Sequence, residues 1–186
     1  MSTQPKYFFI LYILTLATTF TAFRGAAAAE CTENWEDASD IGLGYLWFET
    51  SDTMNYADAV TFCKDRDSRL IEIDSQEQLN FTMEKLITIS EDVPWQSFPE
   101  GVPWETPLQY KAWWGGATDT VEEGSWVWTQ SGNPVQDFIW QSKQPNSKGG
   151  YQNYLCFEIK PSGDTPIGGN DFDHDSKNFP LCQQQM

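Results

Sequence analysis

Few residue types in this chain are suited to covalent or acid–base catalysis. His174 is the single histidine among 186 residues. It lies between aspartates, where a lone histidine is more typical of a solvated turn than of a catalytic base. The four cysteines form no C-x-x-C pair, which argues against a zinc site. No paired acids, phosphate-binding glycine loop or nucleophile motif stands out, so the sequence indicates a non-enzymatic protein.

Carboxylates are the abundant chemical group. The chain has 27 Asp and Glu residues against 11 Lys and Arg residues, a net charge of −16. Such an acidic surface repels phosphate backbones, which excludes nucleic acid as an expected partner. Two interpretations of the acidity remain. It keeps the protein soluble, or some carboxylates hold a hard cation such as calcium, which prefers oxygen ligands.

The first residues have the pattern of a targeting signal. An apolar run over residues 7–23 is flanked by single basic residues, and small residues follow up to Ala29. This order is typical of a secretory signal peptide, and an uncleaved signal anchor is the alternative. We expect residues 1–29 to be removed, leaving residues 30–186 as one extracellular domain. No second apolar run approaches membrane length, so no membrane insertion is expected after cleavage.

Apolar spacing predicts two helices early in the mature chain. Apolar residues at i, i+3, i+4 and i+7 form one helix face at Tyr56, Ala59, Val60 and Cys63. Ser75 followed by Gln78 is a capping-box pattern that predicts the start of a second helix, with the apolar stripe Leu79, Met83 and Leu86. The sequon Asn80-Phe81-Thr82 places Asn80 off that stripe, where a glycan is sterically plausible.

The remaining segments predict strands and loops. Strand patterns occur at residues 45–48, 69–73, 125–129, 155–159 and 179–182, the second being a short strand or an extended link. Four prolines predict irregular surface loop over residues 89–110. Alternation places Trp126 and Trp128 on one strand face, so these two and Trp140 are expected in the core rather than as stacking platforms. Trp95 and Trp104, in the proline-rich segment, are better candidates for an exposed contact. Helices followed by short strands and long loops indicate an α+β fold.

The four cysteines remain to be paired. An even number in an exported chain suggests two disulfides, and the residues alone leave three pairings of Cys31, Cys63, Cys156 and Cys182 open.

These motifs, taken in order, resemble the C-type lectin-like family over residues 31–183. The matching features are Cys63 on its helix, Arg69-Leu70-Ile71-Glu72-Ile73, Trp114 to Asp119 (similar to the W-I-G-L core motif), Glu123 to Trp128, Trp140, Gln144-Pro145-Asn146, Asn170-Asp171 and Phe179 to Cys182. The resemblance implies two helices flanking small antiparallel sheets, with a long loop region. It also implies a secreted carbohydrate-binding protein for microbial or self glycans.

The resemblance further implies a disulfide between Cys63 and Cys182. The other two cysteines depart from the family pattern, since His174 replaces the usual partner of Cys156 and no cysteine follows Cys31 at the usual distance. Three alternatives are open: a Cys31–Cys156 bridge, two free thiols, or an intermolecular bridge through Cys31. We favour a disulfide-capable Cys31 and a buried, free Cys156.

A calcium and sugar site is also implied by the resemblance. In the family, calcium is held by residues flanking the proline of an E-P-N or Q-P-D motif, by an acid just before the strand cysteine, and by an Asn-Asp pair. The hydroxyls of a sugar complete the calcium shell. Carried over to this sequence, the same four residues are implied as metal ligands and as carbohydrate-binding residues: Gln144, Asn146, Asn170 and Asp171.

The family's acid is absent here. Tyr154 lies at its place, so Asn153 or Gln152 would supply an amide oxygen to the metal instead. We take Asn153 as the fifth ligand. Calcium affinity falls with ligand charge, so weak binding is expected unless Asp173 or Asp175 reaches in.

A second, weaker calcium site in some family members corresponds to Asp119 and Glu123. Ser147 and Leu155 stand where its other ligands would be.

The alternative function is a calcium-independent module that binds a protein or another surface. In that case Gln144-Pro145-Asn146 is a loop turn without a metal. The motif also mixes the mannose-type E-P-N and galactose-type Q-P-D forms, so it does not specify the sugar.

Overall fold

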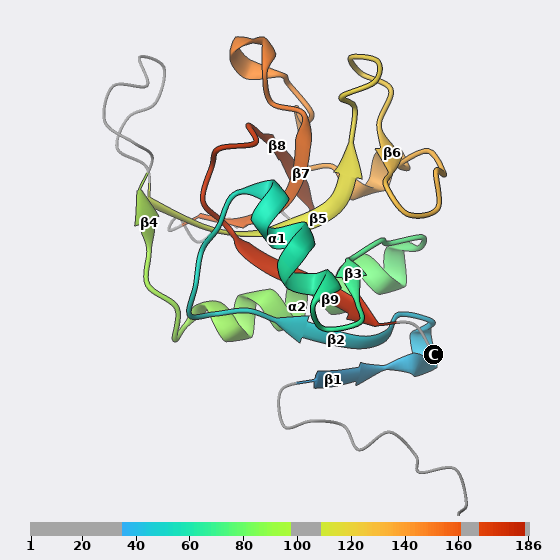
Figure 1. Cartoon of the computed structure of the whole chain (residues 1–186), viewed down its shortest axis with the longest axis vertical. Helices are drawn as coiled ribbons and strands as arrows, with labels where there is room; N and C mark the ends of the chain where they lie inside the picture. The colour runs from blue at the N-terminus through green and yellow to red at the C-terminus, as the bar shows by residue number, and fades with distance from the viewer. Residues whose placement is uncertain (1–34, 98–108, 161–167, 185–186) are drawn as a thin grey trace, which may run out of the picture. The chain divides into compact units, whose positions relative to one another are not determined.

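The computed structural model describes residues 35–97, 109–160 and 168–184 (Figure 1). All of them lie in one compact unit, Cys31–Met186. The predictions for the signal peptide, Cys31 and Trp104 concern residues outside these ranges. Within these ranges, no helix is both long and apolar enough to cross a membrane.

The described elements confirm the α+β order. They are β1 (Trp35–Ala38), β2 (Gly44–Phe48), α1 (Tyr56–Lys64), β3 (Arg69–Leu70), α2 (Gln76–Ser90), β4 (Gln96–Ser97), β5 (Gln109–Thr118), β6 (Val127–Trp128), β7 (Tyr154–Ile159), β8 (Gly169–Phe172) and β9 (Phe179–Gln184). Short 3-10 turns lie at Ser39–Ile41, Asp137–Ile139 and Lys148–Gly150.

The strands join into one mixed sheet rather than small separate ones. The main path is β1-β2-β9-β5-β7-β8, with β3 on β9 and with β4 and β6 on β5. The β5–β9 pair is parallel, and the other strand pairs are antiparallel. The C-terminal strand β9 therefore lies between β2 and β5, in the middle of the sheet (Figure 1).

Glycine lets β5 pass close to β3. A Cβ at Gly116 would lie 2.9 Å from the carbonyl oxygen of Leu70, closer than side chains tolerate. Instead the Gly116 N–H donates to the Ile71 carbonyl at 2.8 Å. The β5–β7 register shifts between Trp114 and Thr118. This irregularity sets the direction of the loop that follows β5.

Helix α1 begins after an Asn55 cap that was not predicted from the sequence, and its buried face is narrower than its apolar spacing predicted. The Asn55 side chain accepts a hydrogen bond from the Asp58 N–H at 2.8 Å. Tyr56, Ala59 and Cys63 are buried. Val60 is 42% exposed, so its place on the apolar face was predicted wrongly. A helix this short contacts the sheet along one stripe, and Val60 lies at its edge.

Helix α2 begins at the predicted cap. The Ser75 hydroxyl accepts from the Gln78 N–H at 3.2 Å. The Gln78 amide oxygen reaches past Ser75 to accept from the Asp74 N–H, and its amide nitrogen donates to the Ile41 carbonyl. The predicted stripe of Leu79, Met83 and Leu86 is buried, and Asn80 is exposed. The capping residues therefore also tie α2 to the turn after β1.

The prediction of irregular loop over residues 89–110 was partly wrong. Helix α2 continues to Ser90, and the two-residue strand β4 pairs with the start of β5. Prolines lie outside β4, which is short enough to fit between them, so they do not interrupt its pairing.

A disulfide joins Cys63 of α1 to Cys182 of β9, as expected. Cys156 on β7 is free and fully buried, also as expected. Burial raises the pKa of its thiol well above the ordinary value, which keeps it protonated and unreactive.

Among the described residues, the tryptophans predicted to lie in the core and the one predicted to be exposed are found as expected. Trp126 and Trp128 are buried in the core, and Trp140 packs edge-on against Trp126 with ring centroids 4.6 Å apart. Trp95 is 39% exposed, with the Lys111 ammonium 4.1 Å from its ring centroid.

Candidate functional site

The candidate site is a cleft between the loop after β5 and the loop before β7. Both loops extend beyond the upper edge of the sheet in Figure 1. A hollow of about 230 Å³ lies between them. It is lined by Asp119, Glu123, Gly124, Trp126, Pro145, Asn146, Ser147 and Asp171.

Asp171 holds the second loop in place. It lies on β8 opposite Leu155 and is fully buried. Its carboxylate accepts hydrogen bonds from the Asn146 N–H at 3.1 Å and from the Ser147 N–H at 2.5 Å. Burial raises the pKa of Asp171, and these two backbone donors act against the rise. The carboxylate thus fixes the segment that follows the cis Gln144–Pro145 bond.

Asp119 is buried with part of its hydrogen-bonding capacity unused. Only 3% of the residue is exposed, and its Oδ2 accepts from the Gly124 N–H at 2.8 Å. Its Oδ1 is buried and has no hydrogen-bond partner among the described residues. Burial raises the pKa of Asp119, and the charges of Glu123 and Asp171 raise it further. The cleft therefore gathers negative charge, and none of the described residues that line it is basic.

Two neutral oxygens in the same region are also unpaired. The Ser147 hydroxyl and the Asn153 amide oxygen are buried and have no partner in the described ranges. The Asn153 carbonyl accepts from the Thr118 hydroxyl at 2.7 Å and from the Asp119 N–H at 3.4 Å, which places Asn153 beside Asp119.

Gln144 and Asn146 bond to one another at the edge of the cleft. The Asn146 side-chain amide donates to the Gln144 amide oxygen at 2.6 Å. Asn146 is exposed and Gln144 half-buried, so their remaining donors and acceptors lie near solvent.

Asn170 does not line the cleft. Its amide nitrogen donates to Glu158 at 3.0 Å, and Glu158 in turn pairs with Lys160 at 2.9 Å. Successive strand residues point to opposite faces, so Asn170 and Asp171 leave β8 on different sides. The structure thus separates the side chains of the Asn-Asp pair.

The structure brings together residues from both predicted metal sets. Asp119 and Glu123 from the weaker set line the same hollow as Asn146 and Asp171 from the stronger one. Ser147 was missed, because at its position the family pattern called for a different ligand. The only feature of the sequence that could have indicated Ser147 as a ligand is its hydroxyl group. Ligation by any of these residues stays a prediction.

The donor set fits a hard cation better than a soft one. In the described part of the chain, no three His, Cys, Asp or Glu side chains are arranged to hold a metal by themselves. Calcium does not require that, because it accepts hydroxyl and amide oxygens as well as carboxylates. The unpaired Asp119, Ser147 and Asn153 oxygens are of these types.

Comparisons with known proteins agree on one family. The family model for the lectin C-type domain matches residues 52–184. C-type lectin domain family 4 member M from Pan troglodytes is 26% identical over 157 residues, covering 83% of this chain but 28% of the relative, so the chain spans less than a third of that relative's length.

Solved structures share the fold. The mouse scavenger receptor C-type lectin carbohydrate-recognition domain has a TM-score of 0.59 at 22% identity, covering 83% of this chain and 96% of that one. A calcium-independent type II antifreeze protein has a TM-score of 0.55 at 17% identity, covering 83% and 94%. With the family model matching most of its length, the chain belongs to the C-type lectin family of carbohydrate-binding domains.

Proposed function

We propose that this protein is a secreted lectin that binds glycan hydroxyls through a calcium ion in the cleft of Asp119 and Asp171. The observation that carries the proposal is the buried Asp119 Oδ1 without a partner. A buried carboxylate oxygen without a hydrogen bond is costly, and a bound cation offsets that cost.

Four residues would hold the ion. Carboxylates would come from Asp119 and Glu123, and neutral oxygens from Ser147 and Asn153. Calcium takes six to eight oxygens in a flexible shell, so places remain for water or for the hydroxyls of a sugar. When bound, the ion supplies direct coordination of those hydroxyls.

The edge of the cleft would orient the sugar. Asp171 holds the backbone of Asn146, and this places the Gln144 and Asn146 amides together at the surface. An amide offers both a donor and an acceptor, which matches a hydroxyl that does the same. These two side chains would therefore select sugars by the arrangement of the hydroxyls next to the ion.

Secretion is the second part of the proposal. The Cys63–Cys182 disulfide suits an oxidising compartment, in agreement with a signal peptide over residues 1–29. Asn80 is exposed on α2, so an N-linked glycan there would extend into solvent.

A calcium-independent binding module is the alternative, and one observation favours it. Both Asp171 oxygens already accept backbone N–H groups, so the loop is held without an ion. The fold itself does not decide the matter, because the antifreeze protein that shares it is calcium-independent.

Calorimetry with calcium tests the proposal. We expect Asp119→Asn and Glu123→Gln each to weaken calcium binding about tenfold or more, because each removes an anionic ligand. Glu122→Gln is the matched control, since Glu122 is exposed and does not line the hollow. Glycan-array binding should then require calcium. Undiminished glycan binding in chelator would instead establish the calcium-independent module.

A further inference from the structure

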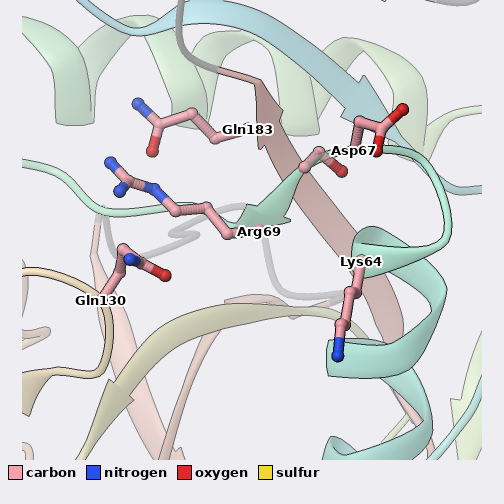
Figure 2. Close-up of a pocket in the computed structure, with 6 residues that line it drawn as sticks. Lys64, Asp67, Arg69, Gln130 and Gln183 are labelled. Carbon is pink, nitrogen blue, oxygen red and sulfur yellow. The ribbon is translucent and has the colours of Figure 1, made fainter.

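A second hollow lies where α1 ends, beside β3, β9 and the turn after β6. Its volume is about 380 Å³, and it shares no lining residue with the cleft. The lining residues are Lys64, Asp67, Ser68, Arg69, Gln130 and Gln183 (Figure 2). We call it the Arg69 groove.

Arg69 has unused hydrogen-bonding capacity in this groove. Its Nη2 lies 4.0 Å from the Glu72 Oε2, too far for a hydrogen bond. Glu72 is buried, and its Oε1 accepts from the Gln130 N–H at 2.8 Å and from the Ser131 N–H at 3.1 Å. No described residue accepts a hydrogen bond from the Arg69 guanidinium, whose Nε is buried and unpaired. Figure 2 shows the guanidinium pointing into the space between Gln130 and Gln183.

Two other lining residues already have partners. The Gln183 amide oxygen accepts from the Glu72 N–H at 3.1 Å, and its nitrogen donates to the Leu43 carbonyl at 3.0 Å. The Ser68 hydroxyl donates to the Cys63 carbonyl at 2.7 Å. These two side chains therefore line the groove, but the hydrogen bonds they make are to the protein itself.

The groups left for a ligand are mostly donors. Lys64 is exposed and makes no ion pair within the described ranges, and Gln130 is exposed with an amide that can donate. Asp67 is the one carboxylate on the lining. The buried Glu72 carboxylate offsets part of the Arg69 charge, and in Figure 2 the Lys64 side chain points away from the Arg69 guanidinium. The donors that lie together are therefore those of Arg69 and Gln130, which favour a ligand that brings acceptor oxygens.

We propose that the Arg69 groove binds the oxyanion of an acidic glycan, a sugar carboxylate or a sulfate ester, independently of calcium. A guanidinium presents parallel N–H donors whose spacing matches two oxygens of such a group, and the exposed Lys64 adds a weaker attraction from further away. The volume is also large enough for a sugar ring around the anion. This inference rests on the proposed function only in taking the anion to be part of a glycan.

The acidic remainder of the chain limits long-range attraction. A net charge of −16 repels anions at a distance. At physiological salt this repulsion is screened beyond about 8 Å, whereas contacts within the groove are screened less. Binding is therefore expected to depend on the contact residues rather than on overall charge.

The experiment is a titration of the purified protein in chelator at physiological salt, followed by NMR or calorimetry. The probes are a sulfated disaccharide, a uronic-acid disaccharide, a neutral disaccharide and inorganic sulfate. We expect at least one acidic sugar to bind.

Arg69→Gln should weaken the binding of that acidic sugar about tenfold, as for a charge-assisted pair. Lys64→Gln should weaken it about threefold, as for an exposed charge. Lys177→Gln, which removes an exposed cation outside the groove, should leave it unchanged.

Asp67→Asn separates an oxyanion site from a neutral sugar site. Asp67 has φ +49°, which asparagine tolerates, so the backbone should be kept. Removing its repulsion should strengthen binding of the acidic sugar about threefold. Weaker binding in this variant, with the neutral disaccharide bound equally well, would overturn the proposal. Inorganic sulfate binding as tightly as the acidic sugar would overturn the glycan part.

The outcomes for the groove and the cleft are independent. Asp119→Asn alters only the cleft and should leave binding of the acidic sugar in chelator unchanged. Loss of calcium binding with intact acidic-sugar binding would refute the proposed function and keep the groove. Calcium-dependent glycan binding that is insensitive to Lys64→Gln and Arg69→Gln, with no acidic sugar bound in chelator, would refute the groove and keep the proposed function.

Discussion

Glu72 and Asp119 are two carboxylates buried to nearly the same extent, with exposures of 4% and 3%. Glu72 is used by the fold: one oxygen accepts the Gln130 and Ser131 N–H groups and so holds the turn after β6. Asp119 accepts one N–H and leaves its other oxygen buried and unpaired. Burial alone therefore does not separate the two acids; the difference is that only Asp119 keeps an oxygen that is buried and has no partner among the described residues.

Glu49 extends the comparison. It lies just after β2, and its Oε1 accepts from the backbone of Thr50, Ser51 and Asp52 at 3.0, 2.8 and 3.3 Å. Like Glu72, it closes a turn with its own hydrogen bonds. In the frame of helices and sheet, these acids need no ligand. In the cleft, Asp119 keeps an unpaired oxygen, and we propose that a cation binds there.

The largest expected effect is on the frame, by which we mean the helices α1 and α2 and the sheet, and it comes from removing the disulfide. Cys63→Ala with Cys182→Ala opens a loop of 119 residues. In the chain-entropy model this lowers the free energy of unfolding by about 4–5 kcal/mol. Urea denaturation monitored by tryptophan fluorescence measures the loss. A decrease below about 1 kcal/mol would show that the frame does not depend on this bridge.

The next effect tests Glu72 directly. Glu72→Ala leaves the Gln130 and Ser131 N–H groups without their acceptor. We expect a loss of about 2–3 kcal/mol in the free energy of unfolding. Glu72→Gln keeps an acceptor oxygen and should lose clearly less. Equal losses in both variants would mean that the charge of Glu72, rather than its hydrogen bonds, supports the turn.

Much of the frame could be predicted from the sequence, because local signals determine it. The spacing of Tyr56, Ala59 and Cys63, the Ser75 cap and the family order of motifs led to both helices and to the disulfide. The length of β5 could not be read in the same way. It is buried on both faces at residues 110–117, so it lacks the alternation that marks a half-exposed strand.

The cleft was predicted only in part, because its shape depends on how two distant loops meet. Sequence placed Asp119 and Asp171 in separate metal sets, whereas the fold brings them to one hollow. Which way Asn170 points depends on the β7–β8 register, which the sequence did not specify. Pairing of Asn146 and Ser147 N–H groups with Asp171 is likewise a tertiary contact.

The cleft acid should respond in the opposite direction from Glu72. Asp119→Asn removes a buried charge whose pKa is raised by burial and by two neighbouring carboxylates. Without calcium we expect Tm to rise by about 2–4 °C, in contrast to the loss in Glu72→Ala. The increase in Tm that calcium gives to the unaltered protein should disappear in this variant. A lower Tm in chelator would mean that Asp119 is structural, as Glu72 is.

The smallest effect is a dependence on pH that should change sign with calcium. In chelator, the folded protein holds protons on Asp119 and Asp171 more tightly than the unfolded chain, because both pKa values lie above the ordinary 3.8. The destabilisation from these charges is therefore fully present at neutral pH and is relieved as pH falls through the raised pKa values. The advantage of Asp119→Asn over the unaltered protein should shrink as pH falls from neutral towards the ordinary pKa of 3.8, which thermal melts in parallel would measure. With calcium, the unaltered protein should be the more stable at neutral pH and lose that advantage on acidification, since protons compete with the ion for the same oxygens. A difference in Tm that stays constant across this range, with and without calcium, would show that the charge of Asp119 is not what distinguishes the cleft from the frame.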